Sequence, residues 1–252
     1  MILVVGKMNL GPVIDSLVLM AKDDTKSHEL NKERGRGSWV HPDGWGIAYL
    51  QNGKFIIKKS VKPIWEDPEV ENLKELNTTL AVLHVRRKTM GTPHIENTHP
   101  FIVSNEEEFV FCHNGTVEDE IPFSSNFEPT GSTDSERLFY SIMTDIKQHA
   151  TPHFITNKIK AFTISSGSNV VLVNKEKSVV GVNYNRYNNY YTMSLAKLPE
   201  GIVVSSEELP YLPDAKWTKV DDSMMVTINN DSQEYNIEKV NGPILEQQSP
   251  LP

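Results

Sequence analysis

Hydrophobic and polar residues alternate along the chain in patterns that predict both strands and helices. The opening run ILVVG, residues 2–6, is apolar throughout, which is typical of a buried strand. The segment 12–24 that follows repeats apolar residues at helical spacing, at Ile14, Leu17, Val18 and Ala21. The chain is therefore predicted to begin with a strand followed by a helix.

The segment WGIAYLQNGKFIIKKS, residues 45–60, alternates around the pair Asn52-Gly53. Both residues of such a pair tolerate positive φ, which suits the type I′ turn of a tight hairpin. The runs LAVLHVR (80–86) and EFVFCHNG (108–115) predict two further strands, each ending in polar residues. Candidate chemistry is expected where these strands end.

A helix is predicted after Thr133. Thr133 followed by Glu136 has the spacing of a capping box, in which the side chain of each residue satisfies a backbone N–H of the other. The apolar residues that come next keep helical spacing: Leu138, Phe139, Ile142, Met143 and Ile146. Asp134 is thereby predicted to lie in the first turn of this helix.

The second half of the chain is predicted to be mostly sheet. Strand-like runs, separated by turns rich in Asn, Asp, Gly and Lys, lie at residues 168–184, 190–195, 201–208 and 224–237. This order of elements favours an α+β layered domain over an alternating parallel sheet. We expect one domain over residues 1–240, followed by a flexible tail at 241–252 that is rich in Pro and Gln.

Composition narrows the class of partner and the compartment. The chain has 252 residues, a formal net charge of -8 and a pI near 5.5, which disfavours binding to nucleic acid or to a membrane. Its apolar opening is too short for a transmembrane span and lacks the features of a signal peptide. The single cysteine excludes an intramolecular disulfide and a cysteine-rich zinc site, so we expect a cytoplasmic protein.

Two arginines follow a predicted strand in HVRRKTMGT, residues 84–92. The planar fork of an arginine binds a carboxylate through two hydrogen bonds, which a lysine cannot copy. Arg86 or Arg87 could thus hold a substrate carboxylate. Taken alone, an exposed arginine is more often part of a surface ion pair.

Two further motifs complement such an arginine. Asn114 and Gly115, on a predicted tight turn, could direct a side-chain amide and a backbone N–H at a developing oxyanion, as acyl transfer requires. Asp134, at a helix start, could receive a substrate ammonium group. An ordinary turn and a simple helix cap would explain these residues separately. Together with Arg86 they match an α-amino acid that carries an amide side chain.

A metal site must be weighed because four histidines fall within one stretch: His84, His94, His99 and His113. No H-x-x-x-H helix pattern is present, and histidines of strands and loops more often have protein partners. We therefore expect no metal and no other cofactor. His41 and Asp43 in HPDGWGIAY could act as base or acid, but Asp-Gly before an aromatic strand first indicates a loop that shapes a pocket.

Six motifs resemble, in order and spacing, those of the class II glutamine amidotransferases: HPDGWGIAY, HVRRKTMGT, ENTHPF, FCHNGTVED, GSTDSERLF and VVSSE. The resemblance covers nearly the whole chain and is closest to compact stand-alone members without a fused synthase domain. It implies a four-layer αββα sandwich of the N-terminal-nucleophile hydrolase type. It also implies amide hydrolysis of L-glutamine or a γ-glutamyl compound, and a synthase as the partner that uses the ammonia.

The resemblance also implies roles for single residues. Arg86 would bind the glutamine carboxylate, Asp134 would bind its ammonium group, and Thr89 would line the substrate loop. Asn114 and Gly115 would form the oxyanion hole. The histidine of ENTHPF, His99, would brace the loop beside the site.

One part of the family pattern is missing. The family's nucleophile is a cysteine directly after the initiator methionine, and its own α-amine assists proton transfer, whereas this sequence begins Met1-Ile2. Cys112 is no substitute, because its thiol is predicted inside a buried strand without a terminal amine. Two interpretations remain. The natural start lies a few residues upstream, or alignment through Gly6 places Ile2 at the cysteine position of a catalytically inactive glutamine-binding protein or partner module.

Overall fold

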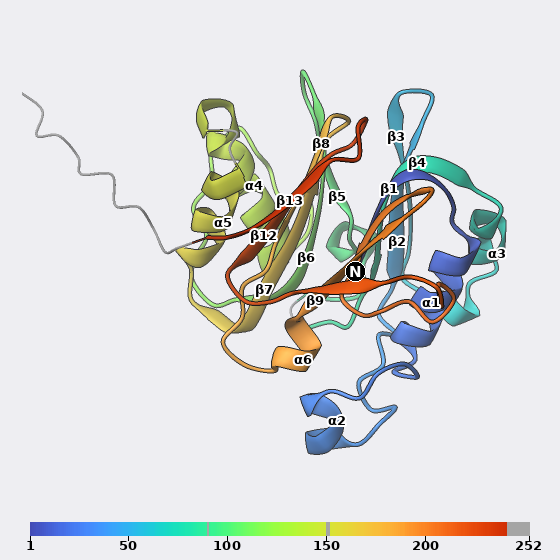
Figure 1. Cartoon of the computed structure of the whole chain (residues 1–252). Coiled ribbons are helices and arrows are strands. Elements are labelled where there is room, and N and C mark those ends of the chain that lie inside the picture. The colour runs from blue at the N-terminus through green and yellow to red at the C-terminus, as the bar shows by residue number, and fades with distance from the viewer. Residues whose placement is uncertain (90, 150–151, 241–252) are drawn as a thin grey trace, which may run out of the picture.

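The computed structural model describes residues 1–89, 91–149 and 152–240, and the predicted flexible tail lies outside them. Two antiparallel sheets face each other, and helices cover the outer face of each, which gives four layers in the order αββα (Figure 1). The four-layer sandwich implied by the family resemblance is confirmed. Among the helices within these ranges, none combines the length and the apolar character that crossing a membrane needs.

The first sheet has seven strands, and its central strand begins at the N-terminus. Strand β1 (Ile2–Asn9) pairs with β10 on one side and with β4 on the other. Asn52 and Gly53, between β2 and β3, have φ of 53° and 73°, so the predicted tight hairpin is confirmed. In spatial order the strands are β11 (Trp217–Val220), β9 (Met193–Leu198), β10 (Gly201–Ser205), β1, β4 (Asn77–Val85), β2 (Trp45–Gln51) and β3 (Lys54–Ser60).

The second sheet has six strands, most of them from the second half of the chain. Its inner strands β6 and β7 pair over most of their length, with one irregularity beside Gly115. In spatial order the strands are β13 (Tyr235–Lys239), β12 (Met224–Asn229), β8 (Lys177–Gly181), β7 (Ile164–Val173), β6 (Glu108–Val117) and β5 (Phe101–Ser104). The predicted sheet-rich second half is confirmed.

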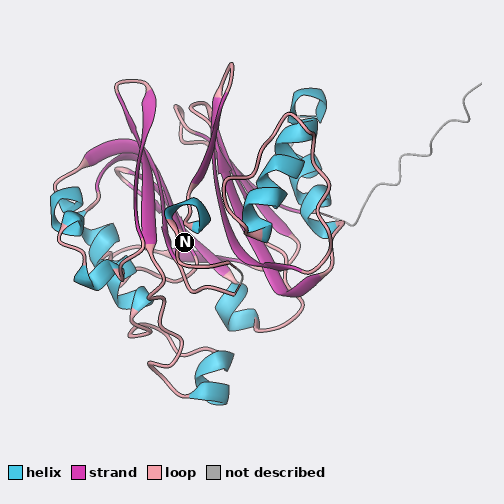
Figure 2. Cartoon of the chain, turned by 180° about the vertical axis from the view of Figure 1, so that it is seen from behind, coloured by secondary structure: helices cyan, strands magenta, loops and turns pink. Residues whose placement is uncertain are grey.

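Helices form the two outer layers and one end of the sandwich (Figure 2). The first sheet is covered by α1 (Gly11–Ala21) and α3 (Glu69–Lys74), and the second by α4 (Asp134–His149) and α5 (Pro152–Lys160). Two short helices, α2 (Glu29–Arg34) and α6 (Asn188–Tyr191), contact each other at one end. Single 3₁₀ turns lie at Ile64–Glu66 and Ile95–Asn97.

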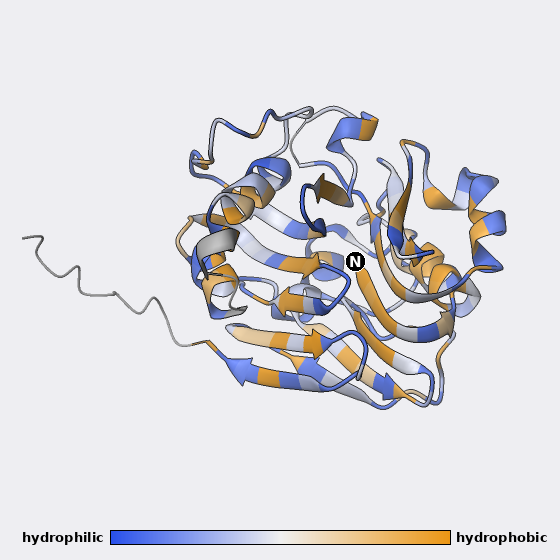
Figure 3. Ribbon diagram, turned by 90° about the horizontal axis from the view of Figure 1, so that it is seen from above, coloured by the Kyte–Doolittle hydropathy of each residue, from blue (hydrophilic) through white to orange (hydrophobic). Residues whose placement is uncertain are grey.

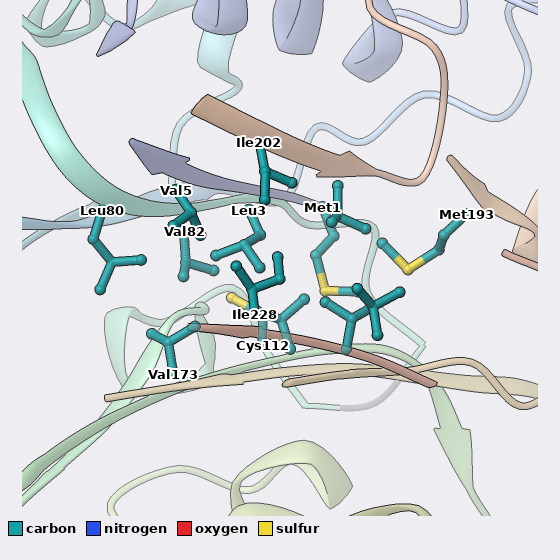
Figure 4. Packing of buried hydrophobic residues seen from close by; sticks show 14 of the residues in the cluster. Met1, Leu3, Val5, Leu80, Val82, Cys112, Val173, Met193, Ile202 and Ile228 are labelled. Atoms are coloured by element: carbon teal, nitrogen blue, oxygen red, sulfur yellow. The ribbon is translucent and has the colours of Figure 1, made fainter. Parts of the chain in front are cut away.

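Alternate residues of β1 enter two different cores. Met1 and Leu3 point between the two sheets, where they pack with Cys112 of the second sheet (Figure 4). Ile2 and Val4 point the other way, into the core beneath α1 and α3. Because both faces of the strands are covered, by helices on one side and by the opposite sheet on the other, the strands carry many apolar residues (Figure 3).

The apolar stripe predicted after Asp134 is the buried face of α4, with Leu138, Phe139, Ile142, Met143 and Ile146 all buried. The strand predicted at residues 190–195 begins too early. Tyr190 and Tyr191 belong to α6, and β9 begins only at Met193. Tyr187 opens that helical turn with a φ of 58°, a local backbone conformation that hydrophobic alternation does not report.

Candidate active site

The end of β4, the end of β6 and the beginning of α4 meet at a cavity of about 90 Å³. All five residues predicted for the site line it: Arg86, Thr89, Asn114, Gly115 and Asp134. They come from three motifs that are well separated in the sequence. The fold therefore brings the predicted residues to one place.

Arg86 is held firmly at the end of β4. It directly follows Val85, the last residue of the strand, and only 4% of it is exposed. Its backbone N–H donates to the carbonyl of Gly44 at 2.8 Å, and its guanidinium donates to the carbonyl of Thr92 at 3.3 Å. Burial lowers the pKa of Arg86, an effect that the Asp43 carboxylate opposes. An arginine still keeps its charge at neutral pH, so the cavity contains a fixed cation.

Asp134 is the first residue of α4 and is 7% exposed. Its Oδ2 accepts a hydrogen bond from the backbone N–H of Val117 at 2.8 Å, which ties the helix to the end of β6. The carboxylate lies at the N-terminal end of the helix, where the helix dipole attracts negative charge. The cavity thus has an anion from α4 as well as a cation from β4.

The predicted capping box is only half formed. Thr133 Oγ1 accepts a hydrogen bond from the backbone N–H of Glu136 at 3.2 Å, as predicted. The Glu136 carboxylate instead accepts from the backbone N–H groups of Thr130 and Gly131, at 3.0 and 2.8 Å. The Glu136 carboxylate is thus used by donors of the loop before the helix, so Glu136 fixes this loop as well as the helix end.

Asn114 and Gly115 do not form the tight turn predicted for them. Both lie within β6, opposite Asn169 and Ser168 of β7, and the register shifts only after Gly115. Gly115 has a φ of +156°, and a Cβ at this position would lie 2.0 Å from the carbonyl oxygen of Gly167. The glycine is therefore explained by the close approach of β7, and the turn propensity of Asn-Gly is overridden by strand pairing.

The loop after β4 is tied to neighbouring segments on both sides. The hydroxyl of Thr89 lies 3.0 Å from that of Thr116, just beyond the Asn114-Gly115 pair. The Asp43 carboxylate accepts a hydrogen bond from the backbone N–H of Lys88 at 2.9 Å. The predicted pocket-shaping loop around Asp43 thus lies against the loop that carries Thr89.

Three buried histidines surround the base of the cavity. His113 lies with Nδ1 2.9 Å from the Ser135 hydroxyl and Nε2 3.0 Å from the Ser168 hydroxyl. The rings of His84 and His99 contact each other, and burial lowers the pKa of both well below the usual value. In the described residues no three side chains of the His, Cys, Asp and Glu types are grouped to hold a metal ion.

Cys112 lies outside the cavity, in the core between the sheets. Its side chain is fully buried, and burial raises the pKa of the thiol to about 12. A thiol needs to ionise to act as a nucleophile, so this one is unreactive at neutral pH. The burial predicted for Cys112 is confirmed.

The beginning of β1 reaches the same region. A smaller cavity of about 30 Å³ is lined by Met1 together with His41, Asn114 and Ser206, among other residues. The Met1 amino group donates to the Ser206 hydroxyl at 3.2 Å, and burial lowers its pKa to about 6. His41 and Asn114 also line the larger cavity, so the start of β1 lies beside the predicted oxyanion residues.

A further wall of the site was not predicted from the sequence. It is formed by Trp39 of the segment 22–44, which we call the cap segment, and by Tyr190 of α6, and it lies beside His41 of the predicted pocket loop. The guanidinium of Arg87 lies 4.1 Å from the ring centroid of Trp39 and donates to a carbonyl of the cap segment. The cap segment is rich in glycine and charged residues and has no hydrophobic periodicity. The sequence therefore did not indicate that Trp39 lines the site.

Comparison with known proteins agrees with the family resemblance of the sequence motifs. Residues 21–166 match the profile of the family described as class II glutamine amidotransferases. A Haemophilus influenzae protein named "Putative glutamine amidotransferase" is 39% identical over 106 residues, 39% of this chain and 35% of that protein. The glutamine–fructose-6-phosphate aminotransferase of Aquifex aeolicus is 24% identical over 145 residues, 56% of this chain and 24% of that enzyme. The chain thus aligns with well under half the length of these two relatives.

Solved structures share the fold. A glutamine aminotransferase class-II domain protein from Silicibacter pomeroyi superposes with a TM-score of 0.63 at 17% identity, covering 96% of this chain and 99% of that one. The allosteric regulatory enzyme of purine biosynthesis superposes with a TM-score of 0.67 at 19% identity, covering 96% of this chain but 49% of that one. At this identity the likeness concerns the fold alone.

Proposed function

Since the chain belongs to the class II glutamine amidotransferases, we propose that it binds L-glutamine, or a γ-glutamyl compound, in the cavity between β4, β6 and α4. The observation that carries the proposal is the pairing of Arg86 with Asp134 around one small cavity. A buried cation and a buried anion on opposite elements suit the carboxylate and the ammonium group of an α-amino acid. Thr89 would contribute to the wall beside this headgroup.

The amide of the substrate would then extend toward Asn114 and Gly115. In acyl transfer the carbonyl oxygen becomes an oxyanion, and donors already fixed in place stabilise it without reorganisation. The Asn114 side-chain amide and the Gly115 backbone N–H are the two donors we assign to this role. The strand pairing of β6 with β7 would hold both in position.

If the natural chain carries the family's cysteine before β1, a residue that the sequence Met1-Ile2 lacks, its thiol is the bond-breaking group. The thiol would pass its proton to its own α-amine and attack the γ-carbonyl carbon. The α-ammonium group would then protonate the leaving nitrogen as the tetrahedral intermediate expels ammonia or an amine, and water would hydrolyse the thioester to the free acid and the thiol. The position is suited to this role because the beginning of β1 lies beside Asn114. Cys112 cannot take the role, since its thiol is buried between the sheets.

The proposal has two forms, which differ in whether the natural chain carries the cysteine. In the first, the natural chain carries the cysteine before Met1 and acts as an amidohydrolase that supplies ammonia to a synthase partner. In the second, Ile2 occupies the position of the cysteine and the protein binds a glutamine-like ligand without cleaving it, as a regulatory or partner module. Both forms use Arg86 and Asp134 in the same way.

The first experiment is an intact-mass measurement with N-terminal fragmentation on protein isolated from its natural source, combined with calorimetric titration of L-glutamine and an ammonia-release assay. A mature N-terminal cysteine with ammonia release supports the amidohydrolase. A chain beginning at Met1 that binds glutamine without ammonia release supports the binding module. If the isolated protein bound neither L-glutamine nor a γ-glutamyl compound, the proposal would be overturned.

A further inference from the structure

A second and much larger cavity lies on the outer side of the second sheet, away from the candidate active site. Its volume is about 780 Å³. It is formed by three segments: the hairpin that joins β5 to β6, residues 124–128, and the face of α4 from Tyr140 to Ile146. Figure 1 shows that hairpin rising from the sheet on the side where α4 lies. None of the residues that line this cavity lines the active-site cavity.

The floor of this cavity is aromatic and apolar. The rings of Phe127 and Tyr140 stack with centroids 4.9 Å apart and planes 10° apart. The Tyr140 hydroxyl donates to a Glu136 carboxylate oxygen at 3.2 Å, which fixes the orientation of the ring. Met143 and Ile146 of α4 complete the floor and are nearly buried. A rigid apolar surface of this kind is already formed before any ligand arrives.

Acidic side chains lie at the rim of the cavity. Glu107 and Glu128 line it, whereas no lysine, arginine or histidine is found among its described lining residues. The Glu107 carboxylate accepts a hydrogen bond from the neutral amide of Asn174 at 3.1 Å, which positions it without neutralising it. The nearby Lys175 points to Glu108 instead, at 4.0 Å.

We propose that this cavity binds a small organic cation, with its ammonium group facing Glu107 and Glu128 and its apolar body lying on Phe127 and Tyr140. Aromatic faces attract cations as well as apolar groups, and the carboxylates raise the local concentration of positive ligands. An anion would face like charges at the rim. A neutral ligand would gain from the floor alone, so the combination selects an apolar amine.

The size of the cavity favours a small molecule over a protein segment. Cavities of roughly 300–1,000 Å³ are the ones that enclose ligands of cofactor or drug size. Three separate segments of the chain enclose this one, whereas protein partners usually meet broader surfaces. The site is independent of the proposed reaction, because its lining residues share nothing with those around Arg86.

The test uses the full chain, labelled with ¹⁵N, and titration with 2-phenylethylammonium followed by NMR. The neutral 2-phenylethanol and the anionic phenylacetate have similar shapes and serve as ligand controls. The double variant Glu107→Gln/Glu128→Gln removes the charge but keeps the size of both side chains. Glu75→Gln/Glu200→Gln, at two exposed glutamates far from the cavity in sequence, is the charge-matched control. Phe127→Leu tests the aromatic floor.

The expected result is a shift of the amide signals of residues 124–128 and 143–146 by the ammonium ligand, with clearly weaker binding of the alcohol. The Glu107/Glu128 variant should weaken binding of the cation by about three- to tenfold, and the control pair should leave it unchanged. Phe127→Leu should weaken it by about two- to fivefold. Equal binding of the alcohol or of phenylacetate, shifts only at other residues, or no shifts would each overturn the proposal.

Discussion

The imidazole rings of His84 and His99 contact each other in a tilted arrangement, with planes 36° apart and centroids 4.3 Å apart. Both residues are buried, at 7% and 5% exposure. Within the described chain, His84 Nδ1 and both ring nitrogens of His99 have no hydrogen-bond partner. Two protonated rings at this distance would repel each other in a medium that also solvates charge poorly. The pair is therefore held in the neutral state.

We predict that acid destabilises the protein already below about pH 6.5. Burial lowers the pKa of His84 and His99 well below 6.5, and that of His41 to about 3. The unfolded chain then binds protons that the folded chain does not, so the free energy of unfolding falls as pH falls. Each such histidine contributes up to about 1.4 kcal/mol between about pH 7.5 and 5.5. Urea unfolding at both pH values measures the difference.

The variant His99→Gln should reduce this pH dependence by the contribution of one histidine. His94→Gln is the matched control, because His94 lies on the surface with its side chain 67% exposed. The control should keep the full pH dependence. An equal pH dependence in the wild type and in His99→Gln would contradict the assignment of the acid sensitivity to this pair.

Arg86→Ala should weaken L-glutamine binding by about 2–4 kcal/mol, because the ligand carboxylate would lose its charged partner in a buried site. Isothermal titration calorimetry measures the change. Arg87→Ala is the control, since Arg87 stacks on Trp39 and donates to the carbonyl of Val40. That variant should change the affinity by less than about 1 kcal/mol. A larger effect at Arg87 than at Arg86 would move the clamp to the neighbouring residue.

Asp134→Asn should weaken glutamine binding by about 1.5–3 kcal/mol, the usual range for a hydrogen bond to a charged group. The asparagine side-chain oxygen can still accept from the N–H of Val117, so the helix start should stay intact. Glutaramate, the glutamine analogue without the α-amino group, provides the control ligand. Its affinity should be nearly the same for both proteins. Equal losses for glutamine and glutaramate would place Asp134 outside the ammonium site.

Gly115→Ala should destabilise the fold as well as the site. The added Cβ would lie 2.0 Å from the Gly167 carbonyl oxygen, so β6 and β7 would have to separate. Gly53→Ala is the control, because Gly53 also has positive φ but nothing lies within 4 Å of its Cβ position. Denaturant unfolding should give an additional loss of about 1–3 kcal/mol for Gly115→Ala relative to this control. Equal losses would mean that backbone strain alone decides the cost.

Cys112 should resist alkylation in the folded protein. Its thiol is fully buried, so the reagent cannot reach it. Burial also raises the pKa of the thiol to about 12, so the reactive thiolate is scarce at neutral pH. Iodoacetamide treatment with and without denaturant, followed by mass spectrometry, measures this. Modification should require unfolding, and Cys112→Ala should leave glutamine binding unchanged. Rapid labelling of the native protein would contradict the assignment of Cys112 to a closed core.

The sequence predicted most of what depends on local pattern. The hairpin at Asn52-Gly53 and the stripe of α4 follow from turn chemistry and helical spacing, and the structure confirms both. Arg86 and Asp134 could be singled out because they lie next to element ends, and their roles stay a prediction. Their position at one cavity depends on the fold. The family resemblance predicted this fold, whereas hydrophobic periodicity alone could not.

What the sequence missed depends on contacts between distant segments. The Asn114-Gly115 pair has turn propensity, but pairing with Asn169 and Ser168 decides its conformation. Glu136 has the spacing of a capping box, but its carboxylate finds donors in the preceding loop. In such cases a tertiary partner competes with the local preference and wins, which a single sequence cannot report.

One buried side chain, that of Asp23, connects separate parts of the cap segment. The Asp23 carboxylate accepts hydrogen bonds from the side-chain amide of Asn31 and from the backbone N–H of Gly37. Trp39 and His41 thus reach the cavity from a loop with its own internal support, whereas Arg86 is anchored to a strand. If the cavity binds an amino acid as proposed, substitutions in this loop would reshape the outer part of the proposed site and leave Arg86 and Asp134 in place. Such substitutions would let the ligand preference diverge without disturbing the sandwich.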